Sequence, residues 1–373
     1  MDKSILDLVG TTSLISLKNI QAYTERILLK MESFNPAGSV KDRSAKYIIE
    51  EAEKRGLLKP GGTIIESSSG NFGIALAMIG AAKGYNIKIL VDPKTTESNK
   101  ALLKGYGAEV IVVTEKDDCG SYHKTRIALA NKMASEIDNS FRPDQCFSLL
   151  NSQAHYEQTA KELLEQCDDN IGAIVVAVST GGQIGGISKY FKENRPDIKI
   201  IGVDAIGSTI FGGEAKSYLT PGVGLGWTPV NLNIDLVDEG YLIEDELAFI
   251  AARVLAKHEG IMIGPSSGAV FLTSMHIADI LPKDKIVISM VADRGDRYVD
   301  TLFNEKWLGE VGFSIDTNIN FLIDKAKRLK PKHTNANKSF FYNNEIEKEL
   351  SIPKSTKDIN EEIMKQNKVR FGE

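Results

Sequence analysis

Short runs of β-branched and aliphatic residues alternate with longer helical stretches along most of this chain. The first strand-like runs and the helical stretches that follow them lie at 63–65 and 71–83, 87–91 and 97–107, and 110–113 and 121–138. The pattern resumes at 171–178, 184–194, 198–203, 245–258, 267–280 and 285–291. This alternation with short loops predicts parallel βαβ units and an open α/β fold, and the number of runs favours two sheets over one.

The length and composition are those of a globular protein. The 373 residues suffice for two to three domains of roughly 150 residues, and no window approaches the ~20 uncharged apolar residues of a membrane span. The charged opening segment has no apolar core, and the three cysteines show no CxxC spacing, so we expect a cytoplasmic protein with reduced thiols. Residues 1–311 hold 33 Lys/Arg against 41 Asp/Glu, which argues against a nucleic-acid groove.

The periodic pattern stops after Trp307. Residues 312–373 are rich in Asn and Lys, and they offer only short helical candidates, at 318–329 and 357–367. We interpret this segment as a C-terminal extension of unknown role, a loosely packed appendage or a partner-binding tail rather than a third domain.

Three glycine- and serine-rich loops, at 66–73, 179–186 and 264–269, each follow a predicted strand and open a predicted helix. Unpaired N–H groups and the helix dipole favour an anion at such a position. Helix capping explains any one loop, whereas three together favour a cleft for phosphate and carboxylate groups. None has Walker A or complete GxGxxG spacing, so the phosphate is not expected on a nucleotide, and we expect no metal site.

A fourth segment, residues 35–43, delivers Lys41 to the start of a helix. A lysine is electrostatically unfavourable there because the helix N-terminus carries partial positive charge. Lys41 is either an ordinary solvated lysine or a lysine engaged as a Schiff base.

The four segments read N-P-A-G-S-V-K-D-R, S-S-G-N-F-G, S-T-G-G-Q-I-G-G and G-P-S-S-G-A. In this order they resemble the signature segments of fold-type II pyridoxal-phosphate enzymes, the cysteine synthase and cystathionine β-synthase family, over about residues 7–307. The resemblance implies a pyridoxal 5'-phosphate cofactor, amino-acid substrates, a homodimer and a two-domain, tryptophan synthase β-like α/β fold. Each domain would be an open, mostly parallel sheet flanked by helices. A large domain of 8–41 plus 144–309 and a small mobile domain of 42–143 would hold the cofactor between them.

The resemblance also implies cofactor roles for individual residues. Lys41 corresponds to the lysine that binds the cofactor covalently and shuttles the Cα proton, and Asn71 to the asparagine that contacts the ring hydroxyl. The cup for the cofactor phosphate corresponds to Ser179, Thr180, Gly181, Gly182 and Gln183. The family usually has threonine where Gln183 stands. Ser266 corresponds to the serine that faces the pyridine nitrogen, although it also suits a helix cap.

Substrate contacts follow from the same resemblance. Ser68, Ser69 and Gly70, with Asn71, correspond to the loop that holds the substrate α-carboxylate. Gln145 stands where a glutamine commonly binds the same carboxylate. The next residue, Cys146, replaces an aromatic residue of the relatives, and we interpret it as a small, buried apolar side chain rather than a functional thiol.

The neutral Ser266 hydroxyl has a chemical consequence. A carboxylate at this position would keep the pyridine nitrogen protonated, whereas a serine leaves it largely unprotonated and weakens the electron sink. We therefore expect β-elimination and β-replacement through an aminoacrylate, and not transamination or decarboxylation.

Two further stretches, 203–212 and 293–298, are most similar to siderophore-pathway members of the family. That resemblance implies O-phospho-L-serine as donor and the L-glutamate amine as nucleophile, giving N-(2-amino-2-carboxyethyl)-L-glutamate, a precursor of 2,3-diaminopropionate. Arg126 also fits this pattern, since a guanidinium binds a phosphate or carboxylate in bidentate fashion. Otherwise Arg126 is an exposed helix charge paired at i±4.

Two other functions remain open at this stage. The first is a cysteine synthase that uses O-phosphoserine or O-acetylserine with sulfide. The second is an inactive relative that serves as a binding scaffold, with residues 312–373 docking a partner.

Overall fold

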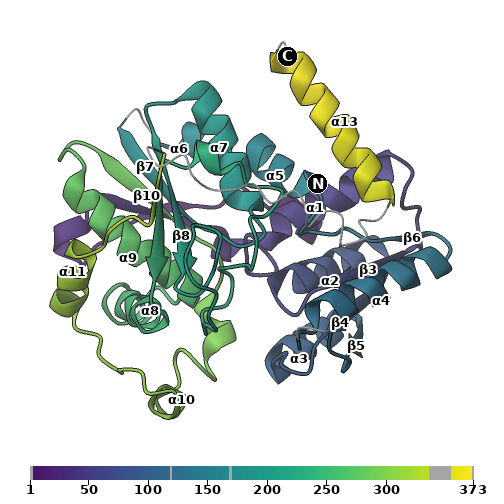
Figure 1. Cartoon of the computed structure of the whole chain (residues 1–373), viewed down its shortest axis with the longest axis horizontal. Helices are drawn as coiled ribbons and strands as arrows, with labels where there is room; N and C mark the ends of the chain where they lie inside the picture. Colours follow the sequence, from purple (N-terminus) through teal and green to yellow (C-terminus); the bar gives the residue numbers. More distant parts are fainter. Residues whose placement is uncertain (1–2, 118–119, 168–169, 336–353, 372–373) are drawn as a thin grey trace. The chain divides into compact units, whose positions relative to one another are not determined.

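The computed structural model describes residues 3–117, 120–167, 170–335 and 354–371 (Figure 1). These residues divide into two compact units. The first unit holds the described residues of Met1–Val9, Lys41–Ala154 and Asn343–Glu373, and the second those of Gly10–Val40 and His155–Tyr342. Residues 144–154 therefore lie in the first unit, whereas the sequence analysis assigned them to the large domain.

The first unit contains a four-stranded, all-parallel sheet in the order β5-β4-β3-β6. Its strands are β3 (Thr63–Ser67), β4 (Asn86–Val91), β5 (Glu109–Val112) and β6 (Ser140–Phe141). Its helices are α1 (Lys41–Lys54), α2 (Asn71–Lys83), α3 (Glu97–Gly105), α4 (His123–Glu136), α5 (Leu150–Ala154) and α13 (Lys354–Phe371), with the 3₁₀ turn η1 (Ile5–Leu8).

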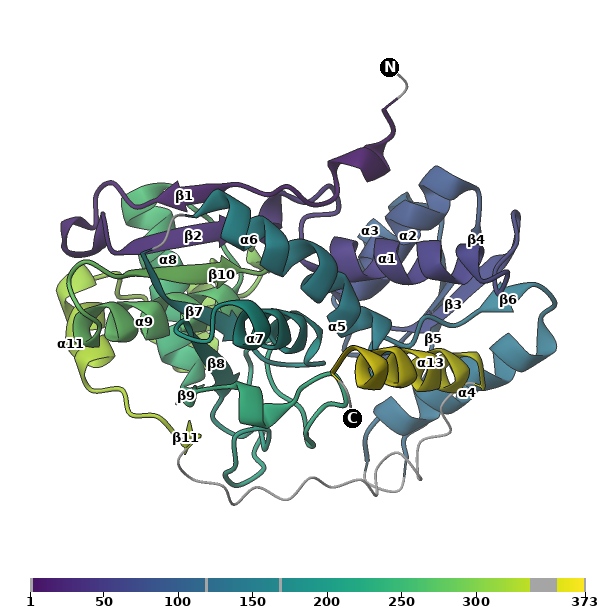
Figure 2. The ribbon, with the colours of Figure 1, turned by 90° about the horizontal axis from the view of Figure 1, so that it is seen from above.

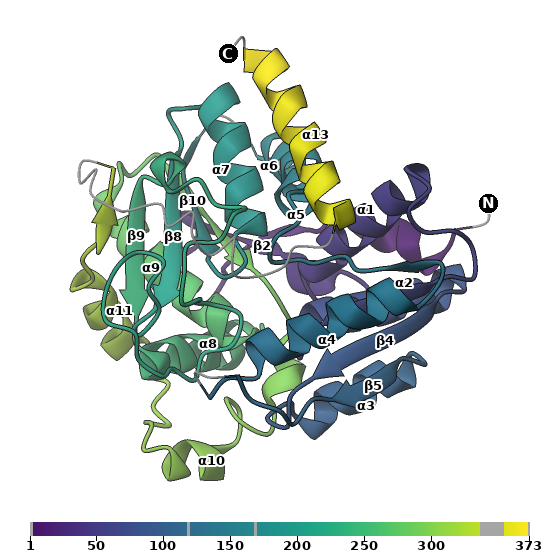
Figure 3. The same ribbon diagram turned by 45° about the vertical axis from the view of Figure 1, so that its right-hand side comes forward.

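Strand β3 is apolar on both faces because helices cover the sheet on both sides. Ile65 packs with Leu90 and Ala130 beneath α4, which runs along one face of the sheet (Figure 3). Helix α2 is apolar over most of its circumference and is buried accordingly. It ends at Gly84, whose φ of 76° is the left-handed conformation of a C-terminal glycine cap.

The second unit contains a seven-stranded sheet in the order β1-β2-β10-β7-β8-β9-β11. Its strands are β1 (Leu14–Ser16), β2 (Ile27–Met31), β7 (Ile171–Ala177), β8 (Lys199–Ala205), β9 (Glu239–Ile243), β10 (Ile286–Val291) and β11 (His333–Thr334). Its helices are η4 (His155–Thr159, a π-helix), α6 (Ala160–Gln166), α7 (Gly182–Asn194), α8 (Asp245–Glu259), α9 (Pro265–Ile280), α10 (Glu305–Glu310) and α11 (Ile319–Lys327). Short 3₁₀ turns are η2 (Gln21–Tyr23), η3 (Glu32–Phe34), η5 (Ile234–Leu236) and η6 (Gly295–Tyr298).

The five central strands of this sheet are parallel, and only the edge strands β1 and β11 are antiparallel to their neighbours (Figure 2). Successive side chains of β7 enter two different cores. Ala173 and Val175 join the core under α8 and α9, whereas Ile174 and Val176 join the core under α6 and α7. This alternation is the period-two pattern of a strand covered on both faces.

These findings confirm an α/β fold with two mostly parallel sheets flanked by helices. One sequence expectation about local structure is wrong: the loop at 264–269 does not follow a strand. It follows helix α8, and the preceding Ile263 makes only an isolated bridge to Arg294. In the described part of the chain, no helix has the length and apolar character needed to cross a membrane.

Candidate active site

The carboxyl ends of the parallel strands in the first unit bring Ser69, after β3, close to Asp92, after β4. The Ser69 hydroxyl donates to the Asp92 carboxylate at 3.0 Å. Arg126 on α4 reaches the same point: its Nη1 donates to Ser69 Oγ and lies 3.1 Å from Asp92 Oδ2. The structure thus joins two predicted substrate-binding residues, since ligands of open α/β sheets bind at this edge.

Arg126 is not an exposed helix charge with a partner one turn away. Its side chain is only 12% exposed, and its partner Asp92 lies on a different element. Burial lowers the pKa of the Arg126 guanidinium from its usual value, and Asp92 opposes this shift. The Nε–H of Arg126 is buried and has no hydrogen-bond partner. A cation with an unused, buried donor can receive an anion without losing an existing contact.

The loop between β3 and α2 presents further donors. Helix α2 begins at Asn71, and its N-cap Gly70 has no side chain to cap the helix, so the first backbone N–H groups of α2 receive no cap from it. The Ser68 hydroxyl oxygen accepts a hydrogen bond from Gly73 N at 3.0 Å, which leaves its proton to donate. These groups suit a carboxylate.

The turn that carries Gln145 follows β6 at the same edge of the sheet. It begins at Asp144, which has a φ of 53°, unusual for a residue other than glycine. Buried contacts hold it: Arg142 Nη1 lies 2.9 Å from Asp144 Oδ2, and Asp144 N donates to Glu66 Oε2 at 2.7 Å. Gln145 is partly exposed, and its carbonyl accepts from Asn151 Nδ2 at 2.8 Å.

Cys146 shares this turn, and its thiol is protonated at neutral pH. Burial raises the pKa of Cys146 to about 12, and the nearby carboxylates of Asp144 and Glu66 add to the shift. The positive charge of Lys41, at the start of α1, acts on the same thiol and partly opposes the shift. The raised pKa agrees with the interpretation of Cys146 as a non-reactive side chain, whereas its partial exposure differs from the expected burial.

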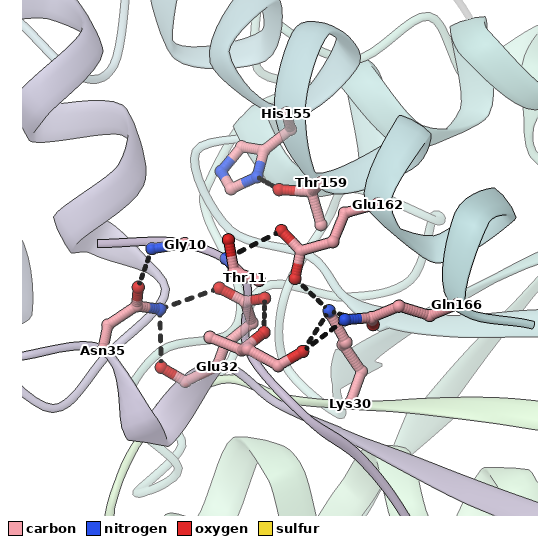
Figure 4. A network of polar contacts seen from close by, with 10 residues as sticks. Gly10, Thr11, Lys30, Glu32, Asn35, His155, Thr159, Glu162 and Gln166 are labelled. Carbon is pink, nitrogen blue, oxygen red and sulfur yellow. Dashed lines mark hydrogen bonds and ion pairs between the residues drawn. The ribbon is translucent and has the colours of Figure 1, made fainter. Parts of the chain in front are cut away.

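The segment that leads to Lys41 is anchored in the second unit by a buried polar network (Figure 4). Lys30, fully buried on β2, donates to Glu162 and to Gln166 Oε1 at 2.7 Å. Directly after β2, the Glu32 carboxylate accepts a hydrogen bond from Asn35 Nδ2 at 2.9 Å. Asn35 opens the N-P-A-G-S-V-K segment, so this network fixes the residues that precede Lys41.

The predicted phosphate cup lies at the N-terminus of α7. Its N-cap Gly181 has a φ of 80°, and an added Cβ would stand 2.9 Å from a ring carbon of Pro229, so the position requires glycine. No side chain caps the helix. The Gln183 Nε2 group is buried without a hydrogen-bond partner. An uncapped helix start and an orphaned amide donor fit a phosphate group.

Residues 220–226 connect this cup to Ser266, at the start of α9. Gly224 N donates to Val178 O at 2.8 Å, and the Ser179 hydroxyl lies 3.4 Å from Gly224 O. Nearby, an added Cβ on Gly222 would stand only 3.2 Å from Ser266 Oγ. The sequence analysis missed this segment, although its alternating glycines at 222, 224 and 226 were a usable signal of close backbone approach.

Asp204, at the end of β8, is a second residue to which the sequence analysis gave no role. Its carboxylate is fully buried, and Oδ2 has no hydrogen-bond partner. Burial raises the pKa of Asp204 to about 7, although hydrogen bonds from Ser208 and from the Ala205 amide oppose this shift. The sequence alone does not indicate that a single aspartate within a strand is buried.

Comparison with known proteins now decides the family. Residues 5–293 match the sequence profile of the family described as pyridoxal-phosphate dependent enzyme. The chain belongs to this family. Its cofactor is accordingly pyridoxal phosphate, and the uncapped start of α7 and the orphaned amide of Gln183 fit the phosphate of that group.

Solved structures of three other enzymes resemble this one over most of its length. An O-ureido-L-serine synthase is 29% identical, with a TM-score of 0.75 over 86% of this chain and 99% of its own. An O-acetylserine dependent cystathionine beta-synthase from Helicobacter pylori is 31% identical, with a TM-score of 0.73 over 81% and 98%. A hydrogen sulfide-producing enzyme from Fusobacterium nucleatum is 33% identical, with a TM-score of 0.74 over 80% and 100%.

Proposed function

We propose that this protein is a β-substituting transferase that acts on O-phospho-L-serine with the amine of L-glutamate as nucleophile. The C–O bond at Cβ breaks and inorganic phosphate leaves, while a C–N bond forms and the amine loses a proton. The product is N-(2-amino-2-carboxyethyl)-L-glutamate, a precursor of 2,3-diaminopropionate for siderophore synthesis. The observation that carries the choice of anionic substrates is Arg126: its Nη1 donates to Ser69 Oγ, and its buried Nε–H has no hydrogen-bond partner.

The structural relatives support a serine-derived donor. One of them depends on O-acetylserine, a serine derivative substituted at the β-oxygen, and another is named for the synthesis of O-ureido-L-serine. A phosphate at the same oxygen adds negative charge, which a buried guanidinium favours more strongly than an acetyl group.

The cofactor residues take the following proposed roles. When bound, pyridoxal phosphate supplies an electron-withdrawing ring that eases the loss of the Cα proton and of the β-substituent. Lys41 holds the cofactor and moves that proton. The phosphate is held at the start of α7 by the Gln183 amide together with Ser179, Thr180, Gly181 and Gly182. Asn71 contacts the ring hydroxyl, and the neutral Ser266 hydroxyl faces the ring nitrogen, which favours β-replacement.

The substrate carboxylate is assigned to the start of α2 in this proposal. The Ser68 hydroxyl has a proton to donate, because its oxygen already accepts from Gly73 N. Backbone N–H groups of Gly70 and Asn71, together with the Gln145 side chain, complete the proposed contacts. We further propose that the protein is a cytoplasmic homodimer.

One alternative has specific support: a cysteine synthase, in which sulfide takes the place of glutamate. A relative with 33% identity is a hydrogen sulfide-producing enzyme, so sulfur chemistry at the same carbon is a second candidate. The inactive-scaffold alternative gains no support, because Lys41, Asn71 and Ser266 all retain side chains suited to the reaction.

Parallel assays of one preparation test the proposal. The holoenzyme is incubated with O-phospho-L-serine and either L-glutamate, L-aspartate or sulfide, and phosphate release and product mass are followed. We expect turnover with L-glutamate, and Lys41→Ala should lose both turnover and the visible absorption of the covalently held cofactor. Product with sulfide but none with glutamate would establish the cysteine synthase instead. Absence of phosphate release in every assay would refute the proposed donor.

A further inference from the structure

Helix α13, in the C-terminal extension, packs against the first unit through one face. Thr356, Ile359 and Ile363 are only 1%, 3% and 7% exposed. Their spacing of three and four residues places them on the same side of a helix. At the edge of this face Glu362 forms an ion pair with Arg55, which follows α1. The described part of α13 is thus a packed element.

Asn360 lies on the same buried face and forms a two-point contact with the backbone. Its Nδ2 donates to Phe147 O at 2.7 Å, and its Oδ1 accepts from Leu149 N at 2.9 Å. One side-chain amide therefore satisfies a backbone carbonyl and a backbone N–H two residues apart in this turn. Leu149 directly precedes α5, whose first N–H groups lack intrahelical partners.

This contact completes the support of the turn that contains Gln145. On its other side, the turn is held by Asp144, which is bound to Arg142 and Glu66. Gln145 lies between the two supports. Its side chain is partly exposed, and no residue in the described part of the chain holds it by a hydrogen bond.

We propose that Asn360 is a positioning residue that holds the turn at 144–149, so that Gln145 is placed to bind the substrate carboxylate. This inference rests on the proposed function, in which Gln145 has that role. The match to the family profile ends at residue 293, so helix α13 lies outside it. Asn360 thus lies outside the matched residues, and the backbone groups of Phe147 and Leu149 that it contacts lie within them.

The test compares three variants of the full-length holoenzyme. Asn360→Ala removes both hydrogen bonds, and Asn360→Asp keeps only the acceptor for Leu149 N. Glu361→Ala is the matched control, because this neighbouring side chain on α13 is exposed. Hydrogen–deuterium exchange reports on the peptide that spans 147–150. Titrations of the cofactor absorption with O-phospho-L-serine and with L-serine give dissociation constants, and steady-state assays give kcat and KM.

Asn360→Ala should speed exchange in this peptide and raise KM and both dissociation constants by roughly tenfold, with kcat and cofactor content within about twofold of the wild type. Asn360→Asp should give a smaller increase, and Glu361→Ala should match the wild type. Unchanged exchange in Asn360→Ala would overturn the contact itself. Faster exchange with unchanged dissociation constants, or an equal loss of kcat and cofactor, would overturn the positioning role.

The two proposals can fail separately. A wild-type enzyme that releases no phosphate from O-phospho-L-serine contradicts the proposed function. The role of Asn360 is then decided by the L-serine titration, because L-serine carries the same α-carboxylate without the phosphate. No response of the wild-type absorption to either amino acid would overturn both.

Discussion

Burial makes the ion pair of Arg126 stronger than the ion pairs of arginines on exposed helix surfaces. Exposed ion pairs contribute little because water screens them, whereas Arg126 is mostly buried and shares its charge with Asp92. The Asp92 carboxylate occupies one side of the guanidinium, and the Nε–H remains without a partner. Nη1 can therefore orient Ser69 while the Nε–H is left to bind a substrate anion.

Arg126→Ala should lower kcat/KM for O-phospho-L-serine with L-glutamate by about one to two decades, since a lost charge-assisted contact costs about 1.5–3 kcal/mol. Cofactor content should stay unchanged. Phosphate release without glutamate, compared with complete turnover, separates the two roles: loss of release implicates the phosphate, and loss of only the second step implicates glutamate. Lys132→Ala, an exposed position on the same helix, is the control. Kinetics equal to the control would remove Arg126 from substrate binding.

Asp204 affects stability in a pH-dependent way. Because burial raises the pKa of Asp204 to about 7, the folded state favours the protonated carboxyl, and the contribution of this group to wild-type stability should fall as pH rises from about 4 to 7. Asp204→Asn removes this ionisation. The variant should therefore gain thermal stability over the wild type at pH 8, by ~3 °C or more, and gain less at pH 5. Calorimetry at both pH values, with the exposed Asp284→Asn as reference, measures this. A gain that does not depend on pH would contradict the assignment.

At the scale of elements, the sequence predicted the repeating strands and helices well because their apolar residues follow regular periods. Strands β3, β4, β7, β8 and β10 lie within about two residues of the expected runs. Strand β2 was missed because Lys30 interrupts its apolar run, and only distant partners such as Glu162 make that burial possible. Strand β9 was missed for a related reason: it follows a long irregular segment without periodic pattern.

The network of Lys30 makes the second unit sensitive to the loss of one charge. Lys30→Met should destabilise the protein by about 3 kcal/mol, because it leaves the Glu162 carboxylate with an incomplete set of partners in a mostly buried place. Lys30→Met with Glu162→Gln should recover more than half of that loss. Urea unfolding gives both values, and the exposed Lys283→Met serves as control. A double variant as unstable as the single one would show that packing of the lysine stem, not its charge, is lost.

For the whole molecule, the sequence revealed the site's loops but not the connections between them. The four signature segments were recognisable because each carries its own local pattern. The pairing of Arg126 with Asp92, the insertion of 220–226 beside Ser266 and the burial of Asp204 depend on contacts between distant residues. No local pattern encodes such contacts. The interpretation of the C-terminal extension as loosely packed is likewise not supported: Leu322 of α11 is fully buried in the second unit, and β11 pairs with β9.

The extension contributes to both units, so a short and a long C-terminal truncation should destabilise the protein to different extents. Removal of residues 354–373 takes away α13 from the first unit. Removal of 312–373 also deletes α11 and β11, exposing the apolar surface that Leu322 covers, where loss of a single buried leucine costs about 2–5 kcal/mol. The longer truncation should therefore lower the melting temperature well beyond the shorter one in circular-dichroism melts. Equal melting temperatures would mean that α11 and β11 add nothing to the second unit.

The labelling rate of the Cys146 thiol can report on motion of the turn at 144–149. Because the pKa of Cys146 is raised to about 12, little thiolate exists at pH 7, and alkylating reagents should modify this partly exposed cysteine slowly while the turn keeps its structure. Opening of the turn to water would return the thiol toward ordinary acidity and raise its labelling rate by orders of magnitude. Mass-spectrometric labelling of the native cysteine can therefore follow motion of this turn during turnover, without the introduction of a foreign probe.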